Sequence, residues 1–331
     1  MTEETPRALL DPARAPTRDG VLRAAAKVAA ILPSTPLLPL EIDGQTIWCK
    51  AESLQPIGAF KIRGAWHRLT DLTPQQAAAG VVGVSSGNHA QGVAWAARRL
   101  GIAATIVMPN DAPRVKLDAT RALGAEVVLY DRSGGEDRDA VAAALIDSTG
   151  RTLVHAFGDP WVIEGQGSLA IEAAAQLKAA TGAEFDTVIA CCGGGGLSSG
   201  IALALPETRV FAVEPEGWDD VGRSLASGTI QRVVNPPPTA CDALQTPSTY
   251  PINFAVLQAR GVTATWVSEA EVRAAMRVAF ARLHLVIEPG GAAALAAVLA
   301  GKVPVGEHTL VTLSGGNVDA DLFARVLTEA V

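Results

Sequence analysis

From about Val81 onward, short runs of β-branched and other apolar residues alternate with longer Ala-rich stretches whose apolar positions recur at helical spacing. The short runs are typical of buried strands and the longer stretches of helices. Such an alternation produces βαβ units, in which helices connect parallel strands. The predicted strands are 81–85, 103–108, 125–129, 152–155, 186–191, 209–213 and 309–313, and the predicted helices are 89–100, 113–123, 136–149, 163–181 and 197–205.

Two local signals add to this pattern. Ser268 precedes an apolar-periodic stretch and Glu271 completes a capping box, so a helix is expected from Ser268 to about Leu285. The pair Asp43-Gly44 between two apolar runs predicts a hairpin turn. No repeat of fixed period is found. The predicted fold class is therefore doubly wound α/β.

Length and composition favour an enzyme with two lobes. A chain of 331 residues exceeds one ordinary domain, which usually holds roughly 100–200 residues. Apolar residues make up 49% of the chain and charged residues 18%, which favours a globular protein with a large core. The net charge of -7 and the scattered basic residues argue against a nucleic-acid partner.

Nothing in the sequence predicts export, a membrane partner or a redox site. The N-terminus carries acidic residues and prolines where a secretion signal has a basic start, and the Ala-rich run 290–300 is about half as long as a membrane span. We therefore expect a cytoplasmic protein. The four cysteines, Cys49, Cys191, Cys192 and Cys241, form no C-x-x-C pair, which favours buried free thiols over a zinc or redox site.

A glycine-rich segment is the first candidate for chemistry. The stretch 191–197, Cys-Cys-Gly-Gly-Gly-Gly-Leu, lies between a predicted strand and a predicted helix. Its glycines can expose backbone N–H groups around an anion at the positive end of the helix, as phosphate binding requires. The spacing matches neither of the common nucleotide-binding glycine motifs. A plain strand-to-helix turn is the alternative, but four glycines without a ligand carry a high entropic cost.

A single lysine, Lys61, lies in the apolar, glycine-flanked segment 53–65. Desolvation there would lower its pKa and favour the neutral amine, which forms imines. An isolated lysine of this kind is more often a solvated surface residue, so it becomes informative only beside a phosphate-binding loop.

Two more loops follow predicted strands. Ser85-Ser86-Gly87-Asn88-His89 presents hydroxyls, an amide and free N–H groups at a helix start, which suit a carboxylate, and a simply capped helix is the alternative. The stretch 311–317 ends an apolar strand with Ser314 and two glycines, for which a plain turn is equally consistent. In open parallel sheets, ligands bind at this end of the strands.

The order of these four loops resembles the pyridoxal-phosphate (PLP) enzymes of fold type II, specifically the serine/threonine dehydratase and serine racemase family with its threo-3-hydroxyaspartate ammonia-lyases. The resemblance runs from about Arg23 to Phe323. It implies two open, twisted, mostly parallel sheets with the cofactor in the cleft between them. It also implies a homodimer, a discontinuous large domain of 1–80 and 159–331, and a small mobile domain of 81–158.

The resemblance also implies the role of each site residue. Lys61 would carry PLP as a Schiff base, with Phe60 beside the ring, Asn88 at the ring hydroxyl and Ser314 at the pyridine nitrogen. The phosphate would be held by Gly193, Gly194, Gly195, Gly196 and Leu197. The substrate would be bound by Ser85, Ser86, Asn88, His89 and Arg138, although Arg138 is equally consistent with a surface arginine at a helix start.

The implied reaction begins when the substrate amine displaces Lys61, whose freed amine then removes the Cα proton. Loss of the β-hydroxyl and hydrolysis after release would give a 2-oxo acid and ammonia. A hydroxyl at the pyridine nitrogen makes the ring a weaker electron sink, which favours elimination over transamination. Ser86 matches the racemase residue that exchanges a proton on the opposite face.

The segment 213–220 resembles the racemase group's divalent-cation site. Position by position, the ligands would be Glu214, the backbone carbonyl of Trp218, and Asp220. Hard oxygen ligands suit Mg²⁺, Ca²⁺ or Mn²⁺ and would be poor for zinc. A solvated acidic turn is the alternative.

The expected activity is a PLP-dependent ammonia-lyase acting on 3-hydroxyaspartate, serine or threonine. Serine racemase is the second hypothesis. A β-replacement synthase is less favoured because its usual Thr-Ser-Gly-Asn loop is missing, and a non-catalytic binding protein is the class-level alternative. The chain departs from the family at Ala243, where glycine is usual, and the added methyl would crowd one flank of the cofactor.

Overall fold

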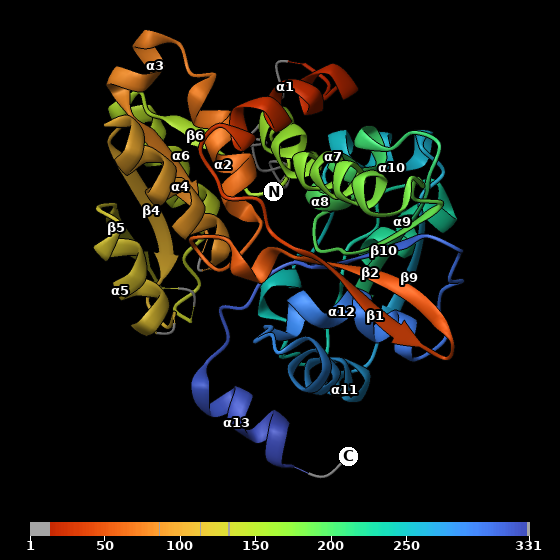
Figure 1. Cartoon of the computed structure of the whole chain (residues 1–331). Coiled ribbons are helices and arrows are strands. Elements are labelled where there is room, and N and C mark those ends of the chain that lie inside the picture. Colours follow the sequence, from red (N-terminus) through yellow and green to blue (C-terminus); the bar gives the residue numbers. More distant parts are fainter. Residues whose placement is uncertain (1–13, 86, 113, 132, 330–331) are drawn as a thin grey trace.

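The computed structural model describes residues 14–85, 87–112, 114–131 and 133–329. Two sheets, each flanked by helices, form two lobes that lie side by side (Figure 1). The predicted fold class, α/β with two mostly parallel sheets, is confirmed. Within these ranges, no helix is both long enough and apolar enough to cross a membrane.

The larger sheet has six strands in the order β1-β2-β10-β7-β8-β9. Only β1 and β2 pair antiparallel, through the predicted hairpin turn at Asp43 and Gly44, which both have positive φ angles of 48° and 80°. The other pairs are parallel. The strands are β1 (Leu37–Ile42), β2 (Gln45–Ala51), β7 (Thr187–Cys191), β8 (Arg209–Pro215), β9 (Thr263–Val267) and β10 (Thr309–Leu313).

The smaller sheet has four parallel strands in the order β5-β4-β3-β6. These are β3 (Val81–Val84), β4 (Ala104–Pro109), β5 (Glu126–Tyr130) and β6 (Thr152–Val154). All four lie within the range 81–158 that was predicted as the small domain. The mobility of that domain stays a prediction.

The predicted helices all form, and several others were missed. The structure contains α1 (Arg18–Ala29), α2 (Lys61–Thr70), α3 (Pro74–Ala79), α4 (Asn88–Leu100), α5 (Arg114–Ala122), α6 (Arg138–Thr149), α7 (Pro160–Thr181), α8 (Gly196–Ala204), α9 (Asp220–Ser227), α10 (Pro251–Ala259), α11 (Glu269–Val278), α12 (Pro289–Leu299) and α13 (Ala320–Thr328). Helix α11 begins after Ser268 with the expected capping box and continues through a π-helical turn to Leu283.

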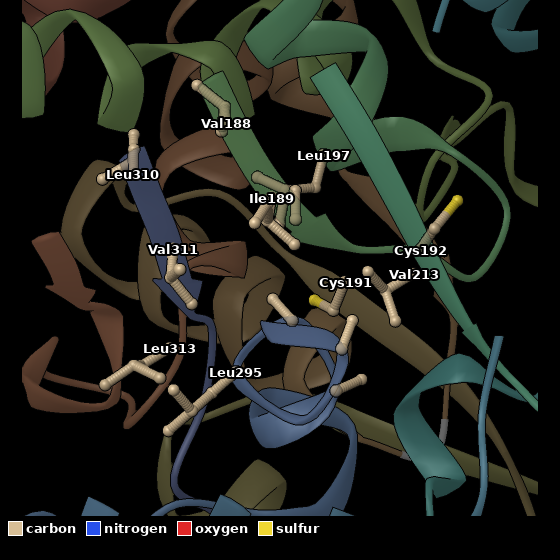
Figure 2. Close-up of a cluster of buried hydrophobic side chains, with 14 of the residues drawn as sticks. Val188, Ile189, Cys191, Cys192, Leu197, Val213, Leu295, Leu310, Val311 and Leu313 are labelled. Carbon is tan, nitrogen blue, oxygen red and sulfur yellow. The ribbon is translucent and has the colours of Figure 1, made fainter. Parts of the chain in front are cut away.

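Buried apolar side chains hold helix α12 against the centre of the larger sheet. Strands β7 and β10 are buried along their whole length, as expected for parallel strands covered on both faces. Figure 2 shows Val188, Ile189, Leu310 and Val311 from these strands gathered with Leu295 of α12. Helices α11 and α12 lie on one side of this sheet, and α7, α8 and α10 lie on the other (Figure 1).

Helix α2 links the lobes, because it packs on α4 of the small lobe and on α7 of the large lobe. Its first residue is Lys61. Gly64 and Gly165 bring α2 and α7 close together, since a Cβ on Gly165 would lie 2.5 Å from the Gly64 Cα atom. The lysine is therefore held at the junction of the two lobes.

Candidate active site

The predicted site residues meet at one cavity of about 170 Å³ between the lobes. Its wall includes Lys61, Asn88, His89 and Ser314, together with the glycine loop that follows β7. The structure thus brings together all the predicted cofactor and substrate residues except Ser86, which lies outside the described residues. The three predicted metal ligands lie elsewhere, around the end of β8.

Lys61 is buried at the head of α2, where its Nζ donates to the carbonyl oxygen of Ala156 at 2.8 Å. Burial lowers the pKa of this amine to about 8. Phe60 is fixed beside it because its backbone N–H donates to the Ser314 carbonyl at 3.0 Å. A buried amine with a lowered pKa is the nucleophile that imine formation requires.

The glycine loop places free backbone N–H groups at the start of α8. Gly195 needs no side chain because its φ is +89°. A Cβ on Gly194 would lie 2.3 Å from the ring of Phe157, and one on Gly196 would lie 2.9 Å from that residue's Cβ. Each glycine therefore has a local reason, and together they leave an anion-binding site at the positive end of the helix.

Asn88 lies at the first turn of α4 and is held by two neighbours that sequence reasoning missed. Its Nδ2 donates to Oε1 of Glu288 at 2.6 Å, and its Oδ1 accepts from Nδ2 of Asn317 at 2.8 Å. A signal for Glu288 was present, because it is a lone acidic residue before Pro289 at the head of an otherwise apolar stretch. Asn317 follows the predicted loop of Ser314 directly.

Two neutral histidines complete the wall on the small-lobe side. His89 donates from Nε2 to the Val154 carbonyl at 2.7 Å, and burial followed by the charge of Lys61 lowers its pKa to about 3. His155 accepts at Nδ1 from the Gly158 N–H at 2.8 Å, and burial holds its pKa well below the usual range. His155 was expected in a structural role, and its place in the cavity wall was missed.

Ser314 is buried and lies 3.0 Å from the Sγ atom of Cys191. Burial raises the pKa of this thiol to about 11, so the thiol keeps its proton and donates. The Ser314 hydroxyl then retains its own proton for a ligand. All four cysteines are buried and free, as predicted.

The open side of the cavity carries charged groups from both lobes. Arg138 is the first residue of α6, is half exposed and lies 3.4 Å from an Asp139 carboxylate oxygen. It borders the cavity and begins a helix, so both predicted placements hold. Lys116 of the small lobe forms an ion pair with Asp242 of the large lobe at the same opening.

The predicted cation ligands form a separate acidic group. Glu214 accepts from the backbone N–H groups of Val221 and Gly222, and Asp220 accepts through Oδ2 from the Thr249 N–H at 2.8 Å. Oδ1 of Asp220 is buried without a partner in the described ranges. Burial and then repulsion from Asp220 raise the pKa of Glu214 well above its usual value. In the same ranges, no group of three His, Cys, Asp or Glu residues could hold a metal.

A buried lysine that faces a glycine anion loop across a cleft between two α/β lobes defines the class of fold type II PLP enzymes. The chain belongs to the family described as pyridoxal-phosphate dependent enzymes, whose model matches residues 30–315.

Individual relatives agree with this assignment. The chain is 39% identical to the L-threo-3-hydroxyaspartate ammonia-lyase of Pseudomonas sp., over 93% of this chain and 97% of that enzyme. It is 35% identical to the serine racemase of Schizosaccharomyces pombe, over 95% and 98%. It matches the crystal structure of a threonine deaminase from T.th. with a TM-score of 0.84 and 42% identity, over 92% and 99%.

Proposed function

We propose that this protein is a PLP-dependent ammonia-lyase that removes water and then ammonia from a small β-hydroxy amino acid to give a 2-oxo acid. The proposed substrates are 3-hydroxyaspartate, serine and threonine. The observation that carries this proposal is Lys61, a buried amine with a lowered pKa in the same cavity as an anion-binding glycine loop. Relatives named as hydroxyaspartate ammonia-lyase and threonine deaminase support it.

The residues present fit the cofactor. Lys61 would hold it covalently, the loop from Gly193 to Leu197 would hold its phosphate, and Asn88 and Ser314 would meet the polar atoms of its ring. Room for the phosphate exists because side chains on the loop would fill it. When bound, pyridoxal phosphate supplies an electron sink for the Cα atom of an amino acid.

Lys61 also serves as the base. Its pKa of about 8 leaves part of the amine neutral at physiological pH, and a neutral amine can accept the Cα proton. Ser86 is proposed as the acid or base on the opposite face, from its place in the sequence. The substrate carboxylate would be met by Ser85, Asn88 and His89 at the N-terminus of α4, whose dipole favours a negative charge.

The groups at the cavity opening serve to orient the substrate and exclude water. Arg138 can meet a carboxylate of the substrate, and the ion pair of Lys116 with Asp242 ties the small lobe to the large lobe. Water exclusion protects a reactive unsaturated product until release.

A divalent cation is proposed at Glu214, Asp220 and the carbonyl of Trp218. Two buried carboxyl groups that repel each other, one with an unpartnered oxygen, fit a hard cation with oxygen ligands. We also propose a homodimer in the cytoplasm that has no nucleic-acid or membrane partner, in line with the family resemblance and the net charge of -7.

Serine racemase activity is the second candidate, favoured by the S. pombe relative and by Ser86. The test is incubation of the purified enzyme with L-serine, L-threonine and the threo and erythro 3-hydroxyaspartates, followed by measurement of 2-oxo acid and of amino-acid chirality. We expect 2-oxo acid as the main product. Racemised serine with negligible 2-oxo acid would reverse the ranking.

A further inference from the structure

Three side chains from separate parts of the chain form one hydrogen-bonded row at the cavity wall. Asn317, in the loop after β10, donates from Nδ2 to the Ile57 carbonyl and to Oδ1 of Asn88, at 2.8 Å each. Asn88, at the head of α4, donates from Nδ2 to Oε1 of Glu288 at 2.6 Å. Glu288 precedes the first residue of α12.

This row decides which way the Asn88 amide faces. Its oxygen is occupied by the Asn317 amide, and Asn317 is itself fixed by the Ile57 carbonyl. The Asn88 nitrogen must then lie on the side of Glu288. An amide nitrogen carries two N–H groups, so one remains after the bond to Glu288. Asn88 borders the cavity, where that second N–H can meet a ligand oxygen.

Glu288 is an expensive residue to keep for packing alone. It is 2% exposed, and its Oε2 is buried with no partner among the residues that the structure describes. A buried carboxyl oxygen without a partner is destabilising. Burial, and next the charge of Asp242, raise the pKa of this carboxyl to about 7. The cost is consistent with a role toward a ligand of the cavity, whose wall includes Glu288.

Gly315 keeps the space that the Glu288 carboxyl occupies. A Cβ at position 315 would lie 2.3 Å from Oε1 of Glu288 and 3.2 Å from Nδ2 of Asn88. The Gly315 carbonyl also accepts from the Glu288 backbone N–H at 3.0 Å. The backbone therefore anchors Glu288 at the place where its side chain reaches Asn88.

We propose that Glu288 is a positioning residue which, together with Asn317, holds the Asn88 amide with its nitrogen toward the ring oxygen of the bound cofactor. This inference rests on the proposed function, because it takes Asn88 as a cofactor contact. Glu288 acts through Asn88, and it sets both the affinity for pyridoxal phosphate and the electronic state of the cofactor ring.

The test compares Glu288→Ala and Asn317→Ala with the conservative Glu288→Gln, which keeps an acceptor oxygen of the same reach. Each purified protein is stripped of cofactor and titrated with pyridoxal phosphate, and both the Kd and the near-visible absorbance of the bound cofactor are recorded. We expect a Kd raised roughly tenfold in both alanine variants, the loss typical of one charge-assisted hydrogen bond. Their absorbance should move to shorter wavelength, because the ring oxygen loses its donor. Glu288→Gln should stay within about twofold of wild type on the same scale.

A packing control separates this role from a structural one. Thr312→Val changes a buried side chain of β10 outside the row and should leave Kd and absorbance unchanged. Melting temperatures of the cofactor-free proteins identify any variant that fails to fold. An unchanged spectrum and Kd in folded Glu288→Ala would overturn the inference and leave the lyase proposal standing. So would a Glu288→Gln protein as impaired as Glu288→Ala. A wild-type protein that binds no pyridoxal phosphate would instead overturn the proposed function.

Discussion

Lys61 and Arg63 lie two residues apart on α2, both are buried, and their surroundings are opposite. Arg63 donates to both carboxylate oxygens of Glu52 at 2.7 and 2.8 Å and to Glu172 at 3.1 Å. These carboxylates raise its pKa despite burial. Lys61 has one backbone carbonyl as its hydrogen-bond acceptor and no ion pair in the described ranges, and burial lowers its pKa to about 8.

The difference teaches how one helix carries both a structural charge and a reactive amine. A buried cation with matched carboxylates stays charged and ties elements together, whereas a buried amine without them becomes neutral and nucleophilic. The ion pairs of Arg63 join α2 to Glu172 on α7, and so fix the position from which Lys61 enters the cavity.

Removing the reactive amine gives the largest expected effect. In Lys61→Ala, we expect the rate of 2-oxo acid formation to fall by about 10⁴-fold, because one residue supplies both the covalent attachment and the base. The purified variant should also lack the yellow colour of a lysine-bound cofactor. Lys27→Ala removes a partly exposed lysine paired with Asp71 and is the matched control. Full turnover in Lys61→Ala would contradict the proposed mechanism.

Removing the structural charge should affect stability in place of chemistry. Arg63→Met leaves Glu52 and Glu172 near each other without a cation, and we expect a loss of about 3–5 kcal/mol in the free energy of unfolding. Urea denaturation measures it. The double variant Arg63→Met, Glu52→Gln should recover part of this loss, because one uncompensated charge is gone. Equal stability of Arg63→Met and wild type would show that these ion pairs are not what fixes α2.

The sequence predicted most of the sheet and of the cavity wall because those features leave local patterns. The strands β7 and β10 are continuous apolar runs, and the four loops carry glycines and hydroxyls at their ends. Helix α12 was missed for a physical reason. It is buried on nearly all sides, so its residues show no polar face from which helical periodicity could be recognised.

Glu288 and Asn317 were missed because their roles depend on contacts between distant segments. Asn88 lies 200 residues from Glu288 and 229 from Asn317 along the chain, and no local motif records such a pairing. His155 was assigned to the core for the same reason, since its partners become visible only when β6 is placed beside the cavity. The family resemblance located the cofactor contacts but not the residues that hold them.

The acidic group of Glu214 and Asp220 extends the comparison to carboxylates that lack a cation. If a divalent ion supplies it, adding EDTA should lower the melting temperature and the activity, and Mg²⁺ or Ca²⁺ should restore both. An ion present at 100 times its Kd would contribute about 2.7 kcal/mol. Asp220→Asn should remove the response to EDTA, whereas Asp219→Asn, a change in its half-buried neighbour, should keep it. Indifference of the wild-type protein to chelation would eliminate the cation.

The smallest effect concerns the protonation of Lys61 itself. Its pKa is lowered from 10.5 to about 8, so the amine of the folded protein loses its proton as pH rises through about 8. Only the neutral amine attacks an aldehyde, and the rate of cofactor attachment to the stripped protein should therefore rise about tenfold per pH unit below that value and level off above it. Stopped-flow absorbance after mixing with pyridoxal phosphate measures this rate, with Lys61→Ala as the baseline for surface amines. A rate that keeps rising to pH 10 would show that burial does not set the pKa, and that Lys61 differs from a solvated lysine less than its contrast with Arg63 suggests.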